Sequence, residues 1–382
     1  MRIAFVGYGS LEQVSGGYIY DRALVGALRS LGHEVDVFGL RGRRYFHAVA
    51  RNLVRGHPVR TRPAPEVPAY DVVIQDELVH PSVFRSNRAL TAWPRGRSLL
   101  ALVHNLRSRQ PGERLAALKA RVERRYLHSV DGVIAVCEET LADVRALGGN
   151  AVPGVVIHPG RDHVMPDVDD RLIEERSRAP GPLRVLYAGA VRRGKGLHRL
   201  LDALAQEPRI DFTLDVVGSL GWPRYARAIR RRLTRFGFES RVRIHGERTG
   251  AALSSLFRQS HVLALPSDRE AYPLSCLEAL GFGLPVLAPS AGGAGEMFTH
   301  GREGFLLDPH DVEAWARALR TLATDRDALR AMAGAAVARW RAHSTWREAA
   351  AAAAAFIEAA AAASPFTEGR APYASAGAAQ SR

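Results

Sequence analysis

The sequence predicts an α/β protein with two Rossmann-like domains. At 382 residues the chain is long enough for two domains with separate cores, and its 47% hydrophobic and 24% charged residues suit a globular protein. In both halves, short apolar runs typical of buried parallel strands alternate with longer segments of helical periodicity. The predicted strands end in polar or glycine-rich loops, which is where open parallel sheets bind their ligands.

We expect five segments along the chain. The first Rossmann-like domain covers residues 1–165, a polar and proline-bounded linker covers 166–182, and the second Rossmann-like domain covers 183–340. Residues 341–364 contain an alanine run that strongly favours a helix. Residues 365–382 are rich in Ser, Ala, Gly and Pro without periodicity, so they predict a disordered tail.

The chain opens with a β-α-β unit. An apolar strand at 3–6 leads through a glycine-rich loop into a helix at 18–30, and a second strand follows. The glycines suggest a dinucleotide fingerprint, but Glu12 stands where its third glycine belongs, which disfavours an NAD-dependent oxidoreductase. Gly16 and Gly17 instead lie at the helix start, where a permissive backbone is one sufficient reason for them.

The net charge of +14 predicts attraction to a phosphorylated substrate, an anionic lipid or a nucleic acid. Residues 41–62 interleave arginines with apolar residues at about every fourth position, so a helix there has a basic face. Such a helix suits an anionic membrane surface, and an ordinary surface helix packed on the sheet explains the pattern equally well. Arginine is dispersed along the chain without aromatic stacking motifs, so we expect no nucleic-acid partner.

The two cysteines, Cys137 and Cys276, are far apart and predict neither a metal site nor a disulfide framework. The N-terminal apolar run is too short for a signal peptide and reads as a strand. No run reaches the roughly 18 apolar residues that a membrane helix needs. We therefore expect a cytoplasmic protein, at most peripheral to the inner face of the plasma membrane.

Two polar clusters follow consecutive predicted strands of the first domain. Asp76, Glu77 and His80 follow one strand, and His104 and Arg107 follow the next. Because the carboxyl ends of parallel strands share one edge of the sheet, both clusters are placed to face a ligand. A structural role, in which the side chains only hold the loops, is the alternative for each of them.

The most informative stretch is residues 262–288. It reads as a buried strand, a loop, a short helix and a second buried strand. Pro273 suits the first turn of that helix, and Gly281 and Gly283 end it. The N–H groups of residues 271–275 then lie at an exposed helix N-terminus, where unpaired donors and the helix dipole favour a phosphate.

Glu270 and Glu278 bracket this helix start, with seven residues between them. The second glutamate is followed by Ala-Leu-Gly-Phe-Gly-Leu-Pro-Val, by Gly292-Gly293 and by Glu296. This order of elements resembles the donor site of the retaining glycosyltransferase family 4 (glycosyltransferase group 1). Two glutamates alone indicate little, because many helices carry two on a solvated face, so the whole ordered set carries the resemblance.

The resemblance covers about residues 1–363 and implies the GT-B fold, in which two Rossmann-like domains face a central cleft and a C-terminal helix crosses back to the N-terminal domain. It implies that Glu278 binds ribose hydroxyls, Glu270 binds sugar hydroxyls, and His104 contacts the transferred sugar. The implied catalytic residues are His104, Glu270 and Lys195. The implied donor-binding residues are Gly16, Gly17, Arg193, Lys195, Gly246, Glu270, Ala271, Tyr272, Pro273, Leu274, Ser275 and Glu278.

The glycine-rich basic loop at 189–196 precedes a predicted helix. Cations there suit a diphosphate leaving group, which gains negative charge as the sugar bond breaks. The resembled family has Gly-Arg at the start of this loop and Lys-Gly at its end. Ala190 stands in place of that arginine, whereas Lys195 is retained, and Arg193 is the candidate replacement for the missing cation.

The resemblance implies transfer of a hexosyl unit, with retention, from a UDP- or GDP-linked sugar to a saccharide or lipid-linked acceptor in cell-surface glycan or glycolipid synthesis. No carboxylate pair is placed for double displacement, so we expect a front-face route. We expect no cofactor and no metal, because Lys195 and helix amides can neutralise the diphosphate. Acceptor-binding candidates are Asp76, Glu77, His80 and Arg107. The alternatives are a sugar-nucleotide epimerase of the same architecture and a basic nucleic-acid-binding protein.

Overall fold

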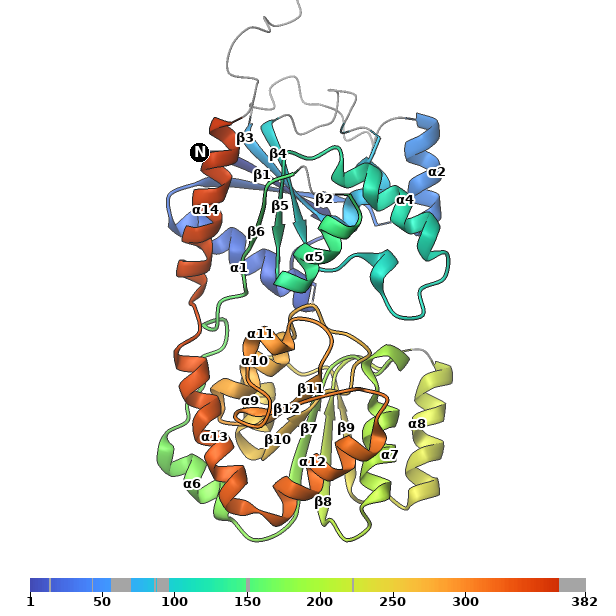
Figure 1. Cartoon of the computed structure of the whole chain (residues 1–382), viewed down its shortest axis with the longest axis vertical. Coiled ribbons are helices and arrows are strands. Elements are labelled where there is room, and N and C mark those ends of the chain that lie inside the picture. Colours follow the sequence, from blue (N-terminus) through green and yellow to red (C-terminus); the bar gives the residue numbers. More distant parts are fainter. Residues whose placement is uncertain are drawn as a thin grey trace, which may run out of the picture.

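The computed structural model contains two six-stranded parallel sheets with interleaved helices, which form two Rossmann-like domains (Figure 1). The predicted tail at 365–382 and residues 56–62 of the basic segment lie outside the described residues. The structure describes residues 1–13, 15–42, 44–55, 70–85, 87, 96–148, 152–221 and 223–363.

The sheet of the first domain has the strand order β2-β1-β3-β4-β5-β6. Its inner strands are buried on both faces, as their continuous apolar runs predict; Ile3, Ala4 and Phe5 of β1 have no exposed surface. The strands are β1 (Arg2–Tyr8), β2 (Glu34–Leu40), β3 (Tyr70–Asp76), β4 (Gly96–Val103), β5 (Gly132–Ala135) and β6 (Gly154–Val156). The helices are α1 (Gly16–Ser30), α2 (Tyr45–Arg55), α3 (His80–Val83), α4 (Ala116–Leu127) and α5 (Glu138–Ala146), with short 3-10 turns η1 (Glu77–Val79) and η3 (Arg107–Arg109).

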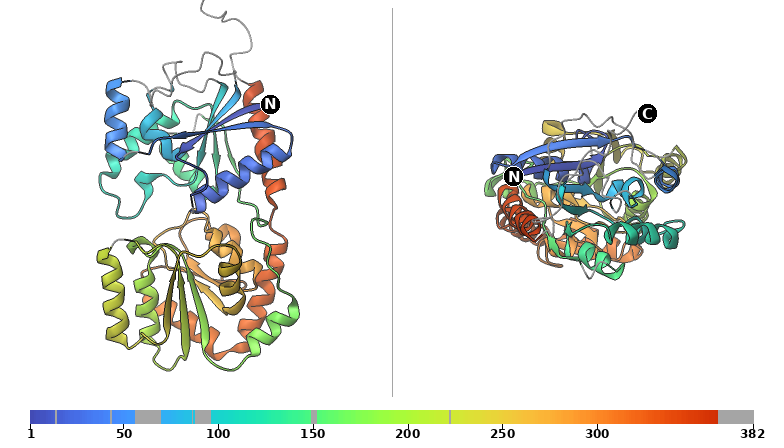
Figure 2. Two further views of the ribbon diagram at one scale, coloured as in Figure 1. Left: turned by 180° about the vertical axis from the view of Figure 1, so that it is seen from behind. Right: turned by 90° about the horizontal axis from the view of Figure 1, so that it is seen from above.

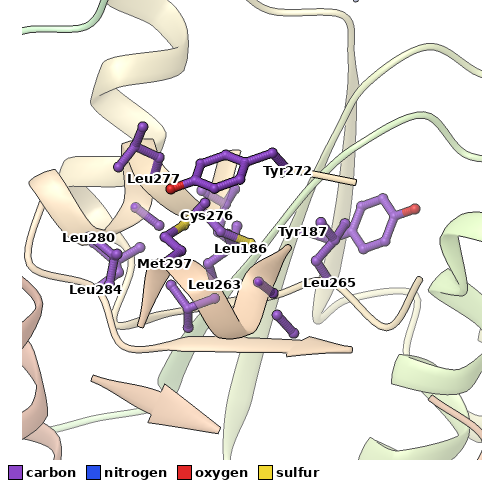
Figure 3. Packing of buried hydrophobic residues seen from close by; sticks show 14 of the residues in the cluster. Leu186, Tyr187, Leu263, Leu265, Tyr272, Cys276, Leu277, Leu280, Leu284 and Met297 are labelled. Atoms are coloured by element: carbon purple, nitrogen blue, oxygen red, sulfur yellow. The ribbon is translucent and has the colours of Figure 1, made fainter. Parts of the chain in front are cut away.

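The sheet of the second domain has the order β12-β11-β10-β7-β8-β9. Figure 3 shows part of its core, in which Leu186 and Leu263 lie near Leu280, Leu284 and Met297. The strands are β7 (Leu183–Ala188), β8 (Phe212–Val217), β9 (Val242–Gly246), β10 (Val262–Ala264), β11 (Val286–Pro289) and β12 (Gly304–Leu307). The helices are α6 (Asp170–Arg178), α7 (Leu197–Gln206), α8 (Pro223–Phe236), α9 (Gly250–Gln259), α10 (Leu274–Gly281), α11 (Ala294–Met297), α12 (Val312–Thr324) and α13 (Arg326–Arg341), with the 3-10 turn η5 (Arg193–Lys195).

The stretch 166–182, expected to be a linker, contains the helix α6. Asp169 caps this helix by accepting a hydrogen bond from the Leu172 N–H at 2.7 Å. Arg176 is buried and donates to the Gly283 carbonyl at 2.6 Å, which fastens α6 to the second domain. The high charge of the stretch predicted an exposed linker. The helix was missed because one of its arginines, Arg176, is buried rather than exposed to solvent.

The last helix, α14 (Trp346–Ala362), packs on the first domain after the chain has completed the second (Figures 1 and 2). A capping box between Thr345 and Glu348 starts the helix. The Trp346 ring packs edge-on against Tyr20 of α1, with ring centroids 5.1 Å apart. Gly160 lies so close that a Cβ there would be 2.2 Å from the Trp346 nitrogen, so only glycine fits. This is the crossing that the family resemblance implies.

Candidate active site

Two loops of the second domain meet at the carboxyl edge of its sheet. One follows β7 and contains Lys195, and the other follows β10 and contains Glu270. The two strands are neighbours, but their connections lead to opposite sides of the sheet, so the loops diverge from a topological switch point. The Asp268 N–H donates to the Gly194 carbonyl at 2.8 Å, which joins one loop to the other. The strand order therefore brings together two residues that are far apart in the sequence.

Lys195 and Glu270 form an ion pair, with Nζ 2.5 Å from Oε1. Their side chains are 20% and 11% exposed, so the pair is mostly buried but still accessible to solvent. The Tyr187 hydroxyl holds the lysine loop by donating to the carbonyls of Ala190 and Lys195 at 3.1 and 3.2 Å. Glu270 lies against Gly292, whose φ of +99° favours glycine and whose Cβ would be 1.7 Å from the Glu270 carbonyl oxygen.

The helix that follows Glu270 leaves backbone donors free. Helix α10 begins at Leu274, one residue later than predicted, because Pro273 adopts an extended N-cap conformation. Among the residues that the structure describes, none accepts a hydrogen bond from the N–H groups of Tyr272, Leu274 or Ser275. This helix start can therefore hold an anion next to the Lys195–Glu270 pair.

Glu278, inside α10, is buried and hydrogen-bonded to a residue that the sequence did not single out. Its Oε1 lies 3.0 Å from Nε2 of His163, which stands in the segment that joins the two domains. Burial disfavours the His163 imidazolium, but the Glu278 carboxylate outweighs burial, so the pKa of His163 is raised. Nothing in the spacing of His163 could have revealed this contact, because it depends on how the joining segment runs past α10.

The buried thiol of Cys276 lies within the electrostatic reach of all three of these charged residues. Burial raises its pKa well above the ordinary value; Glu270 and Glu278 add to this effect and Lys195 opposes it. Cys276 is therefore a neutral packing residue beneath the charged cluster rather than a reactive thiol.

In the first domain, His104 at the end of β4 contacts the start of α1. A Cβ on Gly17 would lie 3.5 Å from Cδ2 of His104, an ordinary contact distance. The His104 Nε2 atom lies 2.7 Å from Oδ1 of Asp21, a buried residue of α1. Burial lowers the His104 pKa, but the charge and hydrogen bond of Asp21, with Glu77, outweigh burial and raise it. Asp21 was not among the predicted site residues.

Asp76 and Glu77 complete a cluster of buried acids with Asp21 at this edge of the first sheet. Glu77 accepts a hydrogen bond from the His104 backbone N–H at 3.0 Å. Burial, reinforced by the charges of Glu77 and Asp21, raises the pKa of Asp76 well above its ordinary value, and burial likewise raises the pKa of Glu77. Crowded buried carboxylates cost stability, which is typical of functional sites.

One group of described residues could hold a cation, because single ligand atoms of Asp21, Asp76 and His104 lie within 4.8 Å of one another. The imidazole nitrogen that faces this group is already hydrogen-bonded to Asp21. Carboxylate oxygens with one imidazole suit several divalent metals, so the donor set selects none in particular. The prediction that no metal is needed stays a prediction.

The two domains contact each other through residues next to the site, where the start of α5 and the loops before α10 and α11 lie together (Figure 1). The Arg269 guanidinium lies 2.6 Å from both Glu139 and Asp143 of α5. Glu296 of α11 accepts hydrogen bonds from the Glu138 backbone N–H at 3.0 Å and pairs with His158 at 2.8 Å. The sequence pointed to Glu296 only as part of a pattern, and it gave no signal for Arg269.

The remaining predicted residues lie apart from these contacts. His80 is buried and uses both ring nitrogens inside the protein: Nδ1 is 2.6 Å from the Glu77 carbonyl and Nε2 is 3.0 Å from the Tyr45 hydroxyl. Arg107 lies over the Tyr45 ring instead. Arg193 is exposed and makes no ion pair with any residue in the described ranges. Gly246 ends β9 with a φ of +69° and open space where a Cβ would lie.

Two Rossmann-like domains in contact, with a cation–acid pair beside a free helix start at a switch point, define a GT-B glycosyltransferase. Comparison with known families agrees: residues 14–164 match the family described as Glycosyltransferase Family 4, and residues 169–339 match Glycosyl transferases group 1. The chain belongs to this glycosyltransferase family. The resemblance read from the donor segment is thereby confirmed.

Individual relatives extend over nearly the whole chain. A D-inositol 3-phosphate glycosyltransferase from Arthrobacter sp. is 27% identical over 410 residues, which cover 92% of this chain and 93% of the relative. Sucrose-phosphate synthase from Thermosynechococcus elongatus has a TM-score of 0.75 at 21% identity, covering 95% of this chain and all of that one. HepE from Anabaena, solved with UDP-glucose, has a TM-score of 0.73 at 21% identity and covers 94% of this chain and all of that one. These structures confirm the predicted fold.

Proposed function

We propose that the protein is a retaining hexosyltransferase that takes a sugar from a UDP- or GDP-linked donor. The observation that carries the proposal is the Lys195–Glu270 pair beside the free N–H groups of α10. This arrangement offers a cation and backbone donors to a diphosphate and a carboxylate to sugar hydroxyls. Related structures add support for the donor class, since HepE was solved with UDP-glucose and with UDP and glucose.

In the proposed reaction, the N–H groups at the start of α10 and the Lys195 ammonium bind the diphosphate. As the glycosidic bond breaks, negative charge grows on the leaving phosphate, and these preorganised donors stabilise it. Glu270 holds sugar hydroxyls, Glu278 binds the ribose, and His104 contacts the transferred sugar. Gly16 and Gly17 approach the diphosphate from the first domain. The acceptor oxygen bonds to the anomeric carbon on the face that the diphosphate leaves, and the acceptor proton passes to the leaving phosphate, which gives retention.

A thermal-shift screen against UDP-, GDP- and ADP-sugars tests the donor assignment. We expect one donor to raise the melting temperature, and Glu278→Ala to abolish that rise because the ribose loses its carboxylate partner. Glu313→Ala is the matched control, since Glu313 is 75% exposed on α12 and, among the described residues, pairs only with Arg317 one turn away. If no nucleotide sugar stabilises the wild-type protein, the assignment is wrong. A product with an altered sugar and no transfer to any acceptor would instead indicate the epimerase.

We further propose a saccharide or lipid-linked acceptor, bound near Asp76 and Glu77, and attachment of the first domain to the inner face of the plasma membrane. One side of α2 is exposed at Phe46 (42%) and Leu53 (44%). Leu115 and Leu118, at the start of α4, are 60% and 43% exposed. Exposed apolar side chains beside a basic helix suit an anionic membrane surface.

Helices α2 and α4 touch where the buried Lys119 ammonium of α4 lies 5.9 Å from the Phe46 ring centroid. Leu115 is the N-cap residue of α4. Its backbone is left-handed, with a φ of 60°, a conformation that is strained for leucine. The packed side of α2 is held by Asn52, which donates to the Ser82 carbonyl at 2.7 Å. None of the described helices has the length and apolarity that a bilayer crossing requires.

Sedimentation with vesicles of phosphatidylglycerol or phosphatidylcholine tests this surface. We expect the protein to pellet with the anionic vesicles at low salt and to be released by added salt, because screening weakens the attraction. Replacing Phe46, Leu115 and Leu118 with serine should abolish pelleting, whereas Met165→Ser, which removes a 75% exposed side chain elsewhere, should not. Recovery of all wild-type protein in the supernatant at low salt would contradict the membrane proposal.

A further inference from the structure

Among the described residues, the side chain of the buried acid Asp21 makes its one hydrogen bond to His104. We propose that Asp21 is a positioning residue of the transfer reaction, which keeps the hydrogen of the His104 ring on Nε2 and leaves Nδ1 to the donor. The inference rests on the proposed function, since it assigns Asp21 a role in presenting the histidine to the sugar nucleotide. It concerns a residue that the donor-site pattern does not include.

The partner of Nε2 indicates where the ring hydrogen lies. Oδ1 of Asp21 is 2.7 Å from Nε2 of His104, and the Asp21 side chain is 1% exposed. A carboxylate can only accept a hydrogen bond, so the shared hydrogen belongs to Nε2. The His104 side chain keeps 15% of its surface exposed, and in the described ranges its Nδ1 has no partner. Nδ1 is therefore the ring nitrogen left for a ligand.

The other contacts of His104 hold it in place without choosing its tautomer. The Tyr20 ring meets the His104 ring edge-on at 5.1 Å, and Gly17 lies against the ring atoms Cδ2, Cγ and Nε2. The backbone N–H of His104 donates to Glu77, and its carbonyl accepts from the Thr140 hydroxyl at 3.2 Å. Packing and backbone contacts tolerate either protonated nitrogen. Asp21 alone distinguishes them, as second-sphere acids do for reactive histidines elsewhere.

A role in stability alone explains the Asp21–His104 pair less well than a role in the reaction. A buried carboxylate carries a desolvation cost that an apolar side chain would avoid, so a pair of this kind is weak evidence for stability. The cost is higher here because Asp76 and Glu77 crowd the same edge. One oxygen of Asp76 is buried and has no hydrogen-bond partner among the described residues, and single ligand atoms of Asp76, Asp21 and His104 lie within 4.8 Å of one another. Such a concentration of acid beside one imidazole favours a functional role.

The first arm of the test needs no substrate. Nitrogen-15 NMR of ring-labelled histidine reports which ring nitrogen carries hydrogen, and comparison with a His104→Gln sample assigns the signals. We expect hydrogen on Nε2 of His104 in the wild type and redistribution toward Nδ1 in Asp21→Asn. Wild-type protein with hydrogen on Nδ1 alone would overturn the inference without any variant. Asp215→Asn, which breaks a similar pair with His245 at 2.6 Å, should leave the His104 signals unchanged.

The second arm measures turnover of the donor found in the thermal-shift screen. We expect Asp21→Asn to lower kcat by about 10- to 100-fold while KM stays within about twofold, the size of effect that loss of an orienting partner gives. Tyr70→Phe is the control for loss of a buried hydroxyl in the same domain. It removes the hydrogen bond to Asp36 at 2.8 Å and keeps the ring, so it should lower the melting temperature and leave kcat unchanged.

The two arms of the test distinguish failure of the positioning role from failure of the proposed function. An active wild type whose kcat is unchanged in Asp21→Asn overturns the positioning role and leaves the glycosyltransferase proposal standing. An unaltered His104 tautomer in that variant overturns the role as well. A wild type that neither transfers nor hydrolyses any nucleotide sugar overturns the proposed function, and with it the reaction in which Asp21 is placed.

Discussion

Lys195→Met is expected to lower kcat/KM for sugar transfer by about 10²- to 10³-fold, the loss typical when one preorganised donor to a developing anion is removed. The side chain of methionine has nearly the same length but no charge, so the leaving diphosphate loses its cation. The same change leaves the Glu270 carboxylate, 11% exposed, without its partner. Initial rates of transfer, or of donor hydrolysis where no acceptor is known, measure the effect.

Two further variants on the same loop sharpen this result. Arg192→Met removes an exposed charge three residues earlier and should change kcat/KM by less than about twofold, since exposed charges are screened. Arg193→Met tests whether Arg193 supplies the cation that Ala190 does not; a loss of about tenfold, equivalent to about 1.4 kcal/mol, would support that role. If Lys195→Met transfers sugar as fast as the wild type, the diphosphate is not bound where we propose.

Arg269→Met is expected to separate the two domains and to raise the donor KM by about tenfold or more, because the charge it removes is partly buried between two acids. Arg269 immediately precedes Glu270 and lies 2.6 Å from both Glu139 and Asp143 of the other domain. Without it, among the described residues Glu139 keeps only the Gly292 N–H and Asp143 keeps only a pair with Arg109 at 3.6 Å. Small-angle scattering should show a larger radius of gyration, and steady-state kinetics should show the change in KM.

A matched variant and a double-mutant cycle isolate this contact. Arg302→Met removes a 73% exposed arginine that pairs with Glu303 and has no ion pair with the first domain among the described residues, so it should change neither quantity. Asp143→Asn in the Arg269→Met background should add little, because both changes break the same ion pair. An unchanged radius of gyration in Arg269→Met would show that this contact does not hold the domains together.

The fold could be predicted from the sequence because its signals are local. The predicted strand at 3–6 lies within β1, and the predicted helix at 18–30 lies within α1. Glu270, Glu278 and Lys195 could be singled out because each stands in a short, ordered motif. Helix α6 escaped prediction because its inward-pointing arginine breaks the ordinary link between charge and exposure.

The partners of the site residues could not be predicted from the sequence, because they depend on how distant segments pass each other. Asp21 lies on α1 and His104 follows β4, so their pairing requires both elements to be in place. His163 meets Glu278 only because the joining segment runs past α10. The role of Arg269 could not be predicted from its loop sequence, because its partner Asp143 lies on α5 of the other domain. Ion pairs between domains have no periodicity in the sequence, so the pattern of a single segment does not predict them.

The return of α14 to the first domain has a consequence for synthesis on the ribosome. Tyr20 and Ser98 are translated early, whereas their partners Trp346 and Ala360 are translated after β12 of the second domain. Part of the apolar surface of the first domain therefore stays uncovered until the strands of the second domain have been made. A nonsense codon shortly before residue 346 would spare every strand of both sheets and still leave the first-made domain incomplete, which makes it the part most exposed to proteases and chaperones.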